Sequence, residues 1–306
     1  NAVAANTTGI QNTSIGGFAL ASNTTAQGNT AIGFGTLYTN TTGASNTAVG
    51  LNALNLSTTA SNNTAVGMSA LIANTTGDTN TAVGKDSMKS NTTGTNNQAF
   101  GTRSLDANTT GTSNVAVGDQ ALGANTTAAN NVAVGQNALL VSTTAANNVA
   151  VGFNALSSLT YNGVPFNVAV GYGAGAAATT GYNLSLVGYN AGTAVTTGGN
   201  ISALGSSALL SNTTGYSNVA MGTNTLRANT TGISNTGIGD SALNANTTAN
   251  NNTAIGYQSL LVNTTGHSNT GLGYASLFRN TTGQANVAVG MLTIQANTTG
   301  SFNTAC

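Results

Sequence analysis

Apolar and polar positions recur along this chain with a period of 17 residues. The glycine that ends each N-T-A-V-G-like motif occurs at Gly16, at Gly33 and then in steps of 17 as far as Gly152. After one step of 19, the series resumes at Gly171 and continues in steps of 17 to Gly290. The unit reads approximately G-x-x-A-L-x-x-N-T-T-G-x-x-N-T-A-V, and 306 residues accommodate about 18 such units. A fixed internal period of this length predicts a stacked, repetitive architecture.

Within each unit, counted from that glycine as position 0, two positions are consistently large and apolar. In a stacked coil a large apolar residue fills the interior at the same place in every turn, and a small residue lies where another backbone approaches. We therefore expect positions 4 and 16 to point inward, and the small residues of position 15 to form a face that packs against neighbouring chains. Examples are Leu54, Leu122 and Leu243 at position 4; Ile15, Val49, Phe100, Val134, Leu204, Met221, Ile255 and Val289 at position 16; and Ala65, Ala116 and Ala220 at position 15.

Strands fit this unit better than helices, because no apolar spacing of 3.6 extends over ten or more positions. Seventeen residues hold two short strands and two turns, and we place one strand over N-T-A-V and a second near A-L or N-T-T. The glycine at position 0 and the glycine of N-T-T-G, as in Gly43 and Gly77, are expected at turns with positive φ. The second turn has a weaker requirement for glycine, since Ala60 and Ala128 replace it in other units.

Stacking of identical units accounts for the abundance of asparagine and threonine and for the scarcity of charge. Asparagine amides bond along a ladder and threonine side chains pack on a pleated face, whereas like charges stacked about 4.8 Å apart repel one another. Charged residues make up 3% of the chain and fall only at positions 1, 2, 5, 6 and 11, which we expect at outward turns.

The pattern divides the chain into regular coils over 1–156, irregular coils over 157–204 and regular coils over 205–306. The irregular part contains a two-residue insertion, the only proline (Pro165), and Gly175 and Gly192 in place of the core leucine. Two interpretations remain open: a tolerated bulge or bend, or a lateral contact site built from aromatic residues. The residues of that contact site are Tyr161, Phe166, Tyr172, Tyr182 and Tyr189.

Charge and composition limit the partners and the chemistry. Five basic residues lie scattered among five acidic ones, without the concentrated basic footprint of nucleic-acid binding. The sequence contains no run of about 18 apolar residues, so we expect no insertion into a membrane. The five aspartates form no sequence-near pair, glutamate is absent, and His267 is the single histidine. We therefore predict no catalytic, cofactor-binding or metal-binding residues, no cofactor and no enzymatic activity.

The N-T-T motifs, for example at Asn23, Asn40 and Asn74, are formally N-glycosylation acceptors. The same motif is explained by ladder packing, and the sequence leaves both interpretations open.

The motifs N-T-A-V-G and N-V-A-V-G, followed by A-L and N-T-T-G, resemble the head repeats of trimeric autotransporter adhesins and the repeat arrays of bacteriophage tail fibres. The resemblance extends over essentially the whole chain. It implies a left-handed parallel β-roll, three chains per fibre and attachment to a host or surface. The 17-residue unit is longer than the usual adhesin-head unit.

Taken together, the sequence predicts an all-β parallel β-solenoid of about 18 coils that serves as an extracellular structural or adhesive fibre segment on a cell or virion surface. Its expected partner is itself: the resemblance implies a homotrimer, and the lack of an atypical polar cap sequence at either end predicts end-to-end stacking or continuation in a longer array. A surface receptor or glycan is a further partner. The alternatives are an ice- or polysaccharide-binding solenoid and a self-stacking filament subunit.

Overall fold

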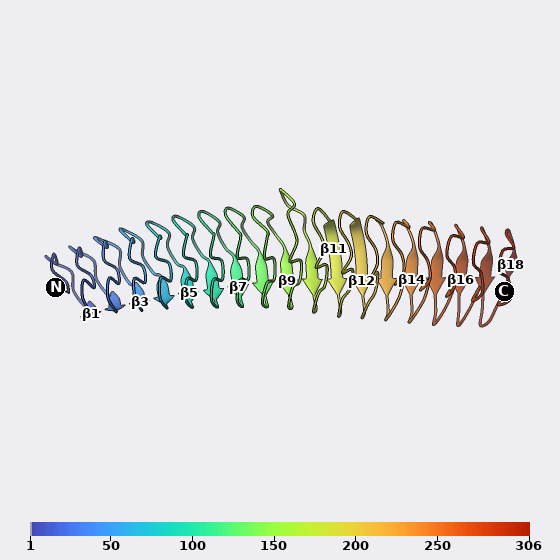
Figure 1. The fold of residues 1–306 in the computed structure, drawn as a ribbon, viewed down its shortest axis with the longest axis horizontal. Helices are drawn as coiled ribbons and strands as arrows, with labels where there is room; N and C mark the ends of the chain where they lie inside the picture. The colour runs from blue at the N-terminus through green and yellow to red at the C-terminus, as the bar shows by residue number, and fades with distance from the viewer. Residues whose placement is uncertain (1) are drawn as a thin grey trace. The chain divides into compact units, whose positions relative to one another are not determined.

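Each N-T-A-V motif forms a short strand, and successive strands pair in parallel from one turn to the next. The computed structural model describes residues 2–306 and is an all-β parallel β-solenoid of about 17 turns with a repeat of about 17 residues, as predicted (Figure 1). Like residues pair with like, as Thr47 with Thr64 and Val49 with Val66. Each threonine or valine ladder therefore runs in register along the strands.

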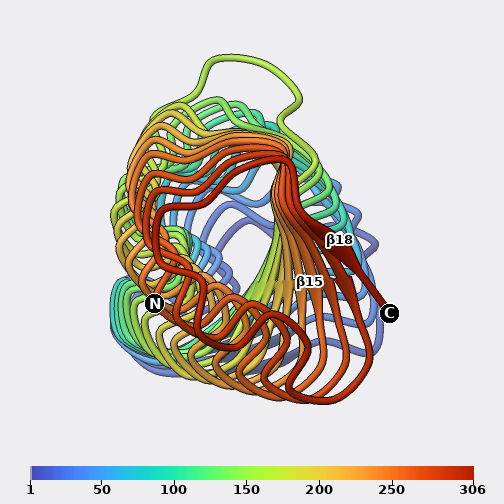
Figure 2. The ribbon, with the colours of Figure 1, turned by 90° about the vertical axis from the view of Figure 1, so that its right-hand side faces the viewer.

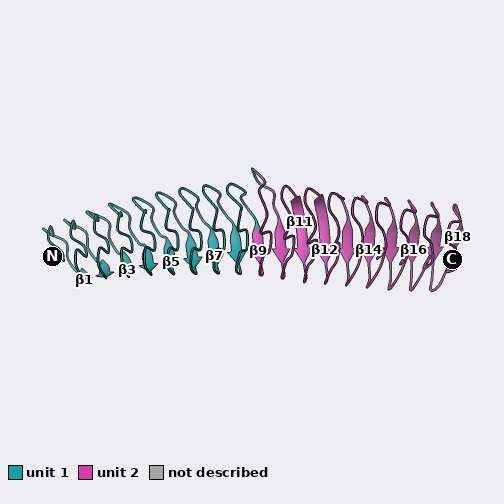
Figure 3. Ribbon diagram, in the orientation of Figure 1, with its two compact units in different colours: residues 1–148, 162–164 teal, residues 149–161, 165–306 magenta. Residues whose placement is uncertain are grey.

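The chain divides into two compact units, residues 1–148 with 162–164 and residues 149–161 with 165–306 (Figure 3). The strands of the first unit are β1 (Thr13–Ile15), β2 (Thr30–Ile32), β3 (Thr47–Val49), β4 (Thr64–Val66), β5 (Thr81–Val83), β6 (Gln98–Phe100), β7 (Val115–Val117) and β8 (Val132–Val134). Those of the second are β9 (Val149–Val151), β10 (Val168–Val170), β11 (Tyr182–Val187), β12 (Gly199–Leu204), β13 (Val219–Met221), β14 (Thr236–Ile238), β15 (Thr253–Ile255), β16 (Thr270–Leu272), β17 (Val287–Val289) and β18 (Thr304–Ala305).

Position 4 supplies the large side chains of the core. Leu54, Leu122 and Leu243 are completely buried, which confirms their predicted inward orientation. Each of these leucines has a positive φ near 50°, a conformation that costs a branched side chain on the order of 1 kcal/mol. Burial of each leucine side chain offsets that cost.

Position 16 points outward, contrary to the prediction. Ile15, Leu204 and Val289 are 60%, 52% and 41% exposed, and Val49 and Val134 are partly exposed. Successive side chains of a strand alternate between its two faces. Because the alanine at position 15 points inward, its large neighbour at position 16 must face out.

The small residues of position 15 are therefore not a surface for neighbouring chains. Ala65, Ala116 and Ala220 are completely buried inside the coil. A side chain at Gly237 would lie 2.6 Å from the methyl group of Thr225, so position 15 is small because the residue at position 3 comes close across the interior.

The predicted second strand in each turn does not form. Residues at positions 1 to 6 adopt turns, with positive φ at positions 2 and 4, for example at Phe18 and Leu20. Hydrogen bonds between turns continue there without extended backbone, because the N–H of Leu20 donates to the carbonyl of Thr36 at 3.0 Å. Figure 2 shows the labelled strands β15 and β18 on one wall of the coil and turns around the rest.

Glycine is required at position 0 but not at the second turn. Gly101 has a φ of 136°, and a side chain there would lie 2.6 Å from the carbonyl oxygen of Gly118 in the next turn. A left-handed φ and backbone at contact distance both exclude other residues. Gly43 and Gly77 lack the predicted positive φ, and alanine replaces this glycine in other turns.

Two buried asparagine ladders complete the interior. At position 7, the amide of Asn108 donates to the side-chain oxygen of Asn91 at 2.7 Å and to the carbonyl of Gly111 at 3.1 Å. At position 13, the amide of Asn114 donates to the carbonyl of Ala128 at 2.8 Å. The predicted ladders are confirmed. Their amides donate hydrogen bonds to the neighbouring asparagine of the ladder and also to backbone carbonyls at the N-T-T-G turn.

The irregular turns keep a filled core by exchanging large and small positions. Gly175 and Gly192 leave space at position 4, and Leu186 fills it from position 15, where most other turns have alanine or glycine. A side chain on Gly175 would lie 2.9 Å from the side chain of Leu186. Both asparagine ladders also become apolar here, with Val195 at position 7 and Leu184 at position 13 completely buried.

Candidate functional site

The outward side of the strands forms a face that carries no charge. Positions 14 and 16 point away from the interior, and among the described residues each is threonine, serine, glutamine or apolar. Every residue at position 16 in strands β1 to β17 is apolar and at least partly exposed. Contiguous exposed apolar surface of this kind is typical of interaction sites. We call positions 14 and 16 of each 17-residue repeat the strand face.

A second kind of surface lies on the turn at positions 1 to 6, where the repeat tolerates variation. This turn carries every exposed charged side chain of the described residues except Asp78, which is at position 11. All ten charged residues are exposed or partly exposed, which confirms that these positions point outward.

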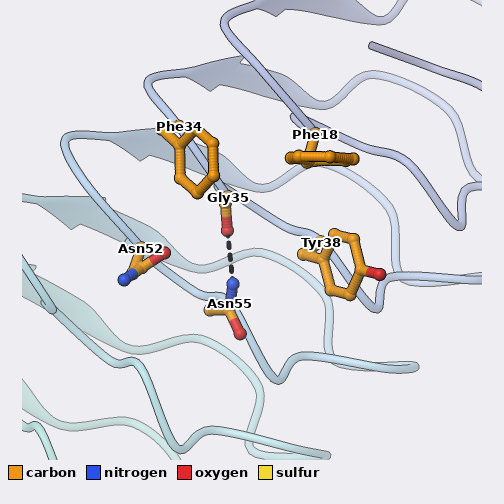
Figure 4. Close-up of a pocket in the computed structure, with 6 residues that line it drawn as sticks. All are labelled: Phe18, Phe34, Gly35, Tyr38, Asn52 and Asn55. Carbon is orange, nitrogen blue, oxygen red and sulfur yellow. Dashed lines mark hydrogen bonds between the residues drawn. The ribbon is translucent and has the colours of Figure 1, made fainter. Parts of the chain in front are cut away.

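Within the first unit, residues from three successive turns of this surface form an aromatic pocket of about 270 Å³ (Figure 4). The ring of Phe18 lies 5.5 Å from that of Phe34 and 6.2 Å from that of Tyr38, nearly perpendicular to both. The pocket is completed by Gly35, Asn52 and Asn55. We call these six residues the aromatic pocket.

Glycine at position 2 opens this pocket. A side chain on Gly35 would overlap the side-chain oxygen of Asn52. Most other turns carry a polar side chain at that position, such as Asn52 itself or Ser69. Sequence reasoning missed the pocket, although the positions of the aromatic residues within the repeat bring Phe18, Phe34 and Tyr38 onto the same turn surface.

A charged cluster occupies the same surface further along the first unit. Lys89 pairs with Asp86 at 3.8 Å, and Arg103 pairs with Asp119 at 3.9 Å. Asp106 lies in this cluster, and its partial burial raises the pKa of its carboxyl against the opposing effect of Lys89. These exposed pairs contribute little stability individually.

The five residues predicted to form a lateral contact are only partly brought together. The rings of Tyr172 and Tyr189 stack at 5.5 Å, and Tyr172 also stacks on Phe153 at 5.2 Å. Tyr182 covers Gly199 on the neighbouring strand. Tyr161 is partly exposed and Phe166 is 61% exposed, on the loop before β10. Their role in lateral contact stays a prediction.

The asparagine of the N-T-T motif is an interior residue in most turns, whereas Asn6 in the first turn is exposed. Asn23, Asn40 and Asn74 are completely buried, and the amide of Asn40 donates to Asn23 and to the carbonyl of Gly43. At these three sites the amide nitrogen that would carry a glycan is therefore enclosed in the folded coil, in agreement with the ladder interpretation.

His267, at position 11, is part of a hydrogen-bond series between turns. Its Nδ1 accepts from the backbone N–H of Asn250 at 2.9 Å, as the carboxylate of Asp78 accepts from Ser61 at 2.6 Å. Over residues 2–306, no three His, Cys, Asp or Glu side chains lie in a group suited to a metal ion. The same residues include no helix with the length and apolarity of a membrane span.

No protein-family profile matches the chain, and no curated protein matches its sequence. What the geometry supports is a parallel β-solenoid repeat protein with two distinctive surfaces, the strand face and the variable turn surface.

Proposed function

We propose that this chain is a structural or adhesive segment of an extracellular fibre on a cell or virion surface, in which copies associate side by side through the strand face. The resemblance to adhesin heads and phage tail fibres favours three copies. The observation that carries the proposal is the exposed apolar residue at position 16 in turn after turn.

A second copy of the chain is the partner that best fits this face. The rows of Thr47 and Val49 repeat with the turn spacing, and another copy presents rows with the same spacing. Ridges of one face can therefore interleave with those of another along their length. The absence of charge at positions 14 and 16 removes the desolvation cost that usually opposes such contacts.

The arrangement of threonines supports a fibre over an ice-binding surface. The hydroxyl of Thr109 donates to the carbonyl of Thr126 at 3.0 Å, whereas Thr110 is exposed. The two adjacent threonines thus make different contacts, unlike the T-x-T spacing in which both side chains point to the same side of a strand.

Light scattering of the full chain tests the proposal. We expect a mass that is a multiple of 29.8 kDa, with three copies preferred, at micromolar concentration. Val117→Lys brings like charges together on the strand face, and we expect it to weaken association by at least about tenfold. Thr110→Lys adds the same charge at an exposed position off the strand face and should leave the mass unchanged.

Circular dichroism of both variants confirms that the coil is intact. A wild-type chain that is folded and monomeric at this concentration contradicts the proposal. So does a folded Val117→Lys variant that associates as strongly as the wild type.

A further inference from the structure

We propose that the aromatic pocket binds a neutral pyranose ring, one sugar unit of a glycan. This inference deepens the adhesive part of the proposed function and rests on it for its biological setting. Its physical basis is separate, because the pocket residues belong to positions 1, 2 and 5 and not to the strand face.

The size and openness of the pocket suit a single ring. Its volume of about 270 Å³ is just below the range of drug-sized ligand sites. It exists because Gly35 stands where most turns have a polar side chain, so the next turn closes its lower side with Asn52 and Asn55 (Figure 4). An extended peptide or a helix would need a longer groove.

The aromatic residues supply the apolar contacts that a sugar needs. Phe18, Phe34 and Tyr38 are 48%, 55% and 41% exposed. A pyranose has a face of C–H groups that packs on aromatic rings, and these rings lie at right angles to one another, so that two sides of one ligand can be contacted.

The amides supply the polar contacts. The Asn55 amide donates one N–H to the carbonyl of Gly35 at 2.7 Å, which fixes its orientation. Among the described residues it has no further side-chain hydrogen bond, so its oxygen and its second N–H remain for a ligand. An amide both donates and accepts, as sugar hydroxyls do, and Asn52 adds a second amide beside it.

The absence of charge selects a neutral ligand. No charged side chain lines the pocket, and none precedes Asp78 in the sequence. A carboxylate or sulfate on the sugar would lose hydration without meeting a cation. A quaternary ammonium group would find aromatic faces but no carboxylate to balance its charge.

Saturation-transfer NMR on the full chain tests this site with the methyl glycosides of glucose, galactose and mannose. Tetramethylammonium and glucuronate are the charged comparison probes. We expect transfer from the protein to at least one neutral glycoside at millimolar concentration, and transfer to both charged probes at least about tenfold weaker.

Gly35→Asn fills the pocket while keeping a residue that the repeat accepts there, since Asn52 has a φ of 57° at the same position and Gly35 one of 68°. We expect this variant and Tyr38→Ala to lose the transfer by at least about tenfold. Gly173→Asn makes the same change at position 2 of a turn in the second unit, outside the pocket, and should bind as the wild type does.

Transfer to none of the three glycosides overturns the inference, as does equal transfer to wild type and Gly35→Asn. Stronger transfer to tetramethylammonium than to the glycosides also overturns it, in favour of a cation cage. Light scattering on the same samples separates this failure from that of the fibre proposal. An associated chain without sugar binding refutes the pocket alone, and a monomer that binds sugar refutes association alone.

Discussion

Asparagine at position 7 links three parts of the coil at once. Asn108 donates to Asn91 in the preceding turn and to Gly111 in its own turn, and it accepts from Asn125 in the following turn at 2.8 Å. A buried polar group costs free energy only when it is left without a partner. The ladder is therefore stable as a whole and sensitive to the loss of any member.

Replacement of Asn108 by alanine is expected to destabilise the first unit by about 2–4 kcal/mol, because a buried polar group in each of its three partner residues loses one hydrogen bond. Chemical denaturation monitored by circular dichroism measures this change. Thr110→Ala, at an exposed position of the same motif, should stay within about 0.5 kcal/mol of wild type. Equal effects of the two substitutions would contradict the ladder account.

Strand alternation explains what the sequence could and could not predict about the elements. The 17-residue period, the strand over N-T-A-V and the buried Leu54 followed directly from the pattern. The orientation of positions 15 and 16 did not, because side-chain size suggested that the valine belongs inside. The missed signal is Asn46 and its equivalents at position 13: a buried asparagine there requires the alanine two residues later to point inward as well.

Sequence reasoning was similarly limited for the second strand and for the candidate site. The leucine at position 4 gave no sign of its positive φ, which glycine usually adopts. The aromatic pocket depends on Gly35, a residue whose contribution is the space it leaves, and on rings from successive turns. Spacing within the repeat predicts which residues are neighbours, but not that a cavity remains between them.

The exchange of core volume in the irregular turns gives a prediction for elements β10 to β12. Leu186→Ala removes a completely buried side chain and should cost about 2–5 kcal/mol. Gly175→Leu alone should also destabilise, by overpacking against Leu186. The double variant should recover a large part of both losses, because Gly175 has a φ of 60°, close to that of the leucines at position 4.

A double-mutant cycle from urea denaturation measures this coupling. Strictly additive losses would show that Leu186 and position 175 do not compete for the same space.

At the scale of the whole molecule, the repeat separates stability from interaction. The interior positions vary little. Each carries either a ladder asparagine or a core side chain, and that side chain contacts its equivalents in the preceding and following turns. The turn surface at positions 1, 2 and 5 is free to vary, and it carries the aromatic pocket, the charged cluster and the stacked tyrosines. The strand face keeps one character throughout, as an interface between identical copies would require.

The rate at which the native methionines oxidise tests the central claim, that the strand face is covered by another copy. Met221, at position 16, and Met68, at position 1, are each 40% exposed in the single chain, and Met88 is completely buried. Peroxide oxidation of the folded full chain, followed by peptide mass spectrometry, compares all three without any substitution. The account predicts that Met221 oxidises at least about tenfold more slowly than Met68 and approaches the rate of Met88. Equal rates for Met221 and Met68 would contradict it.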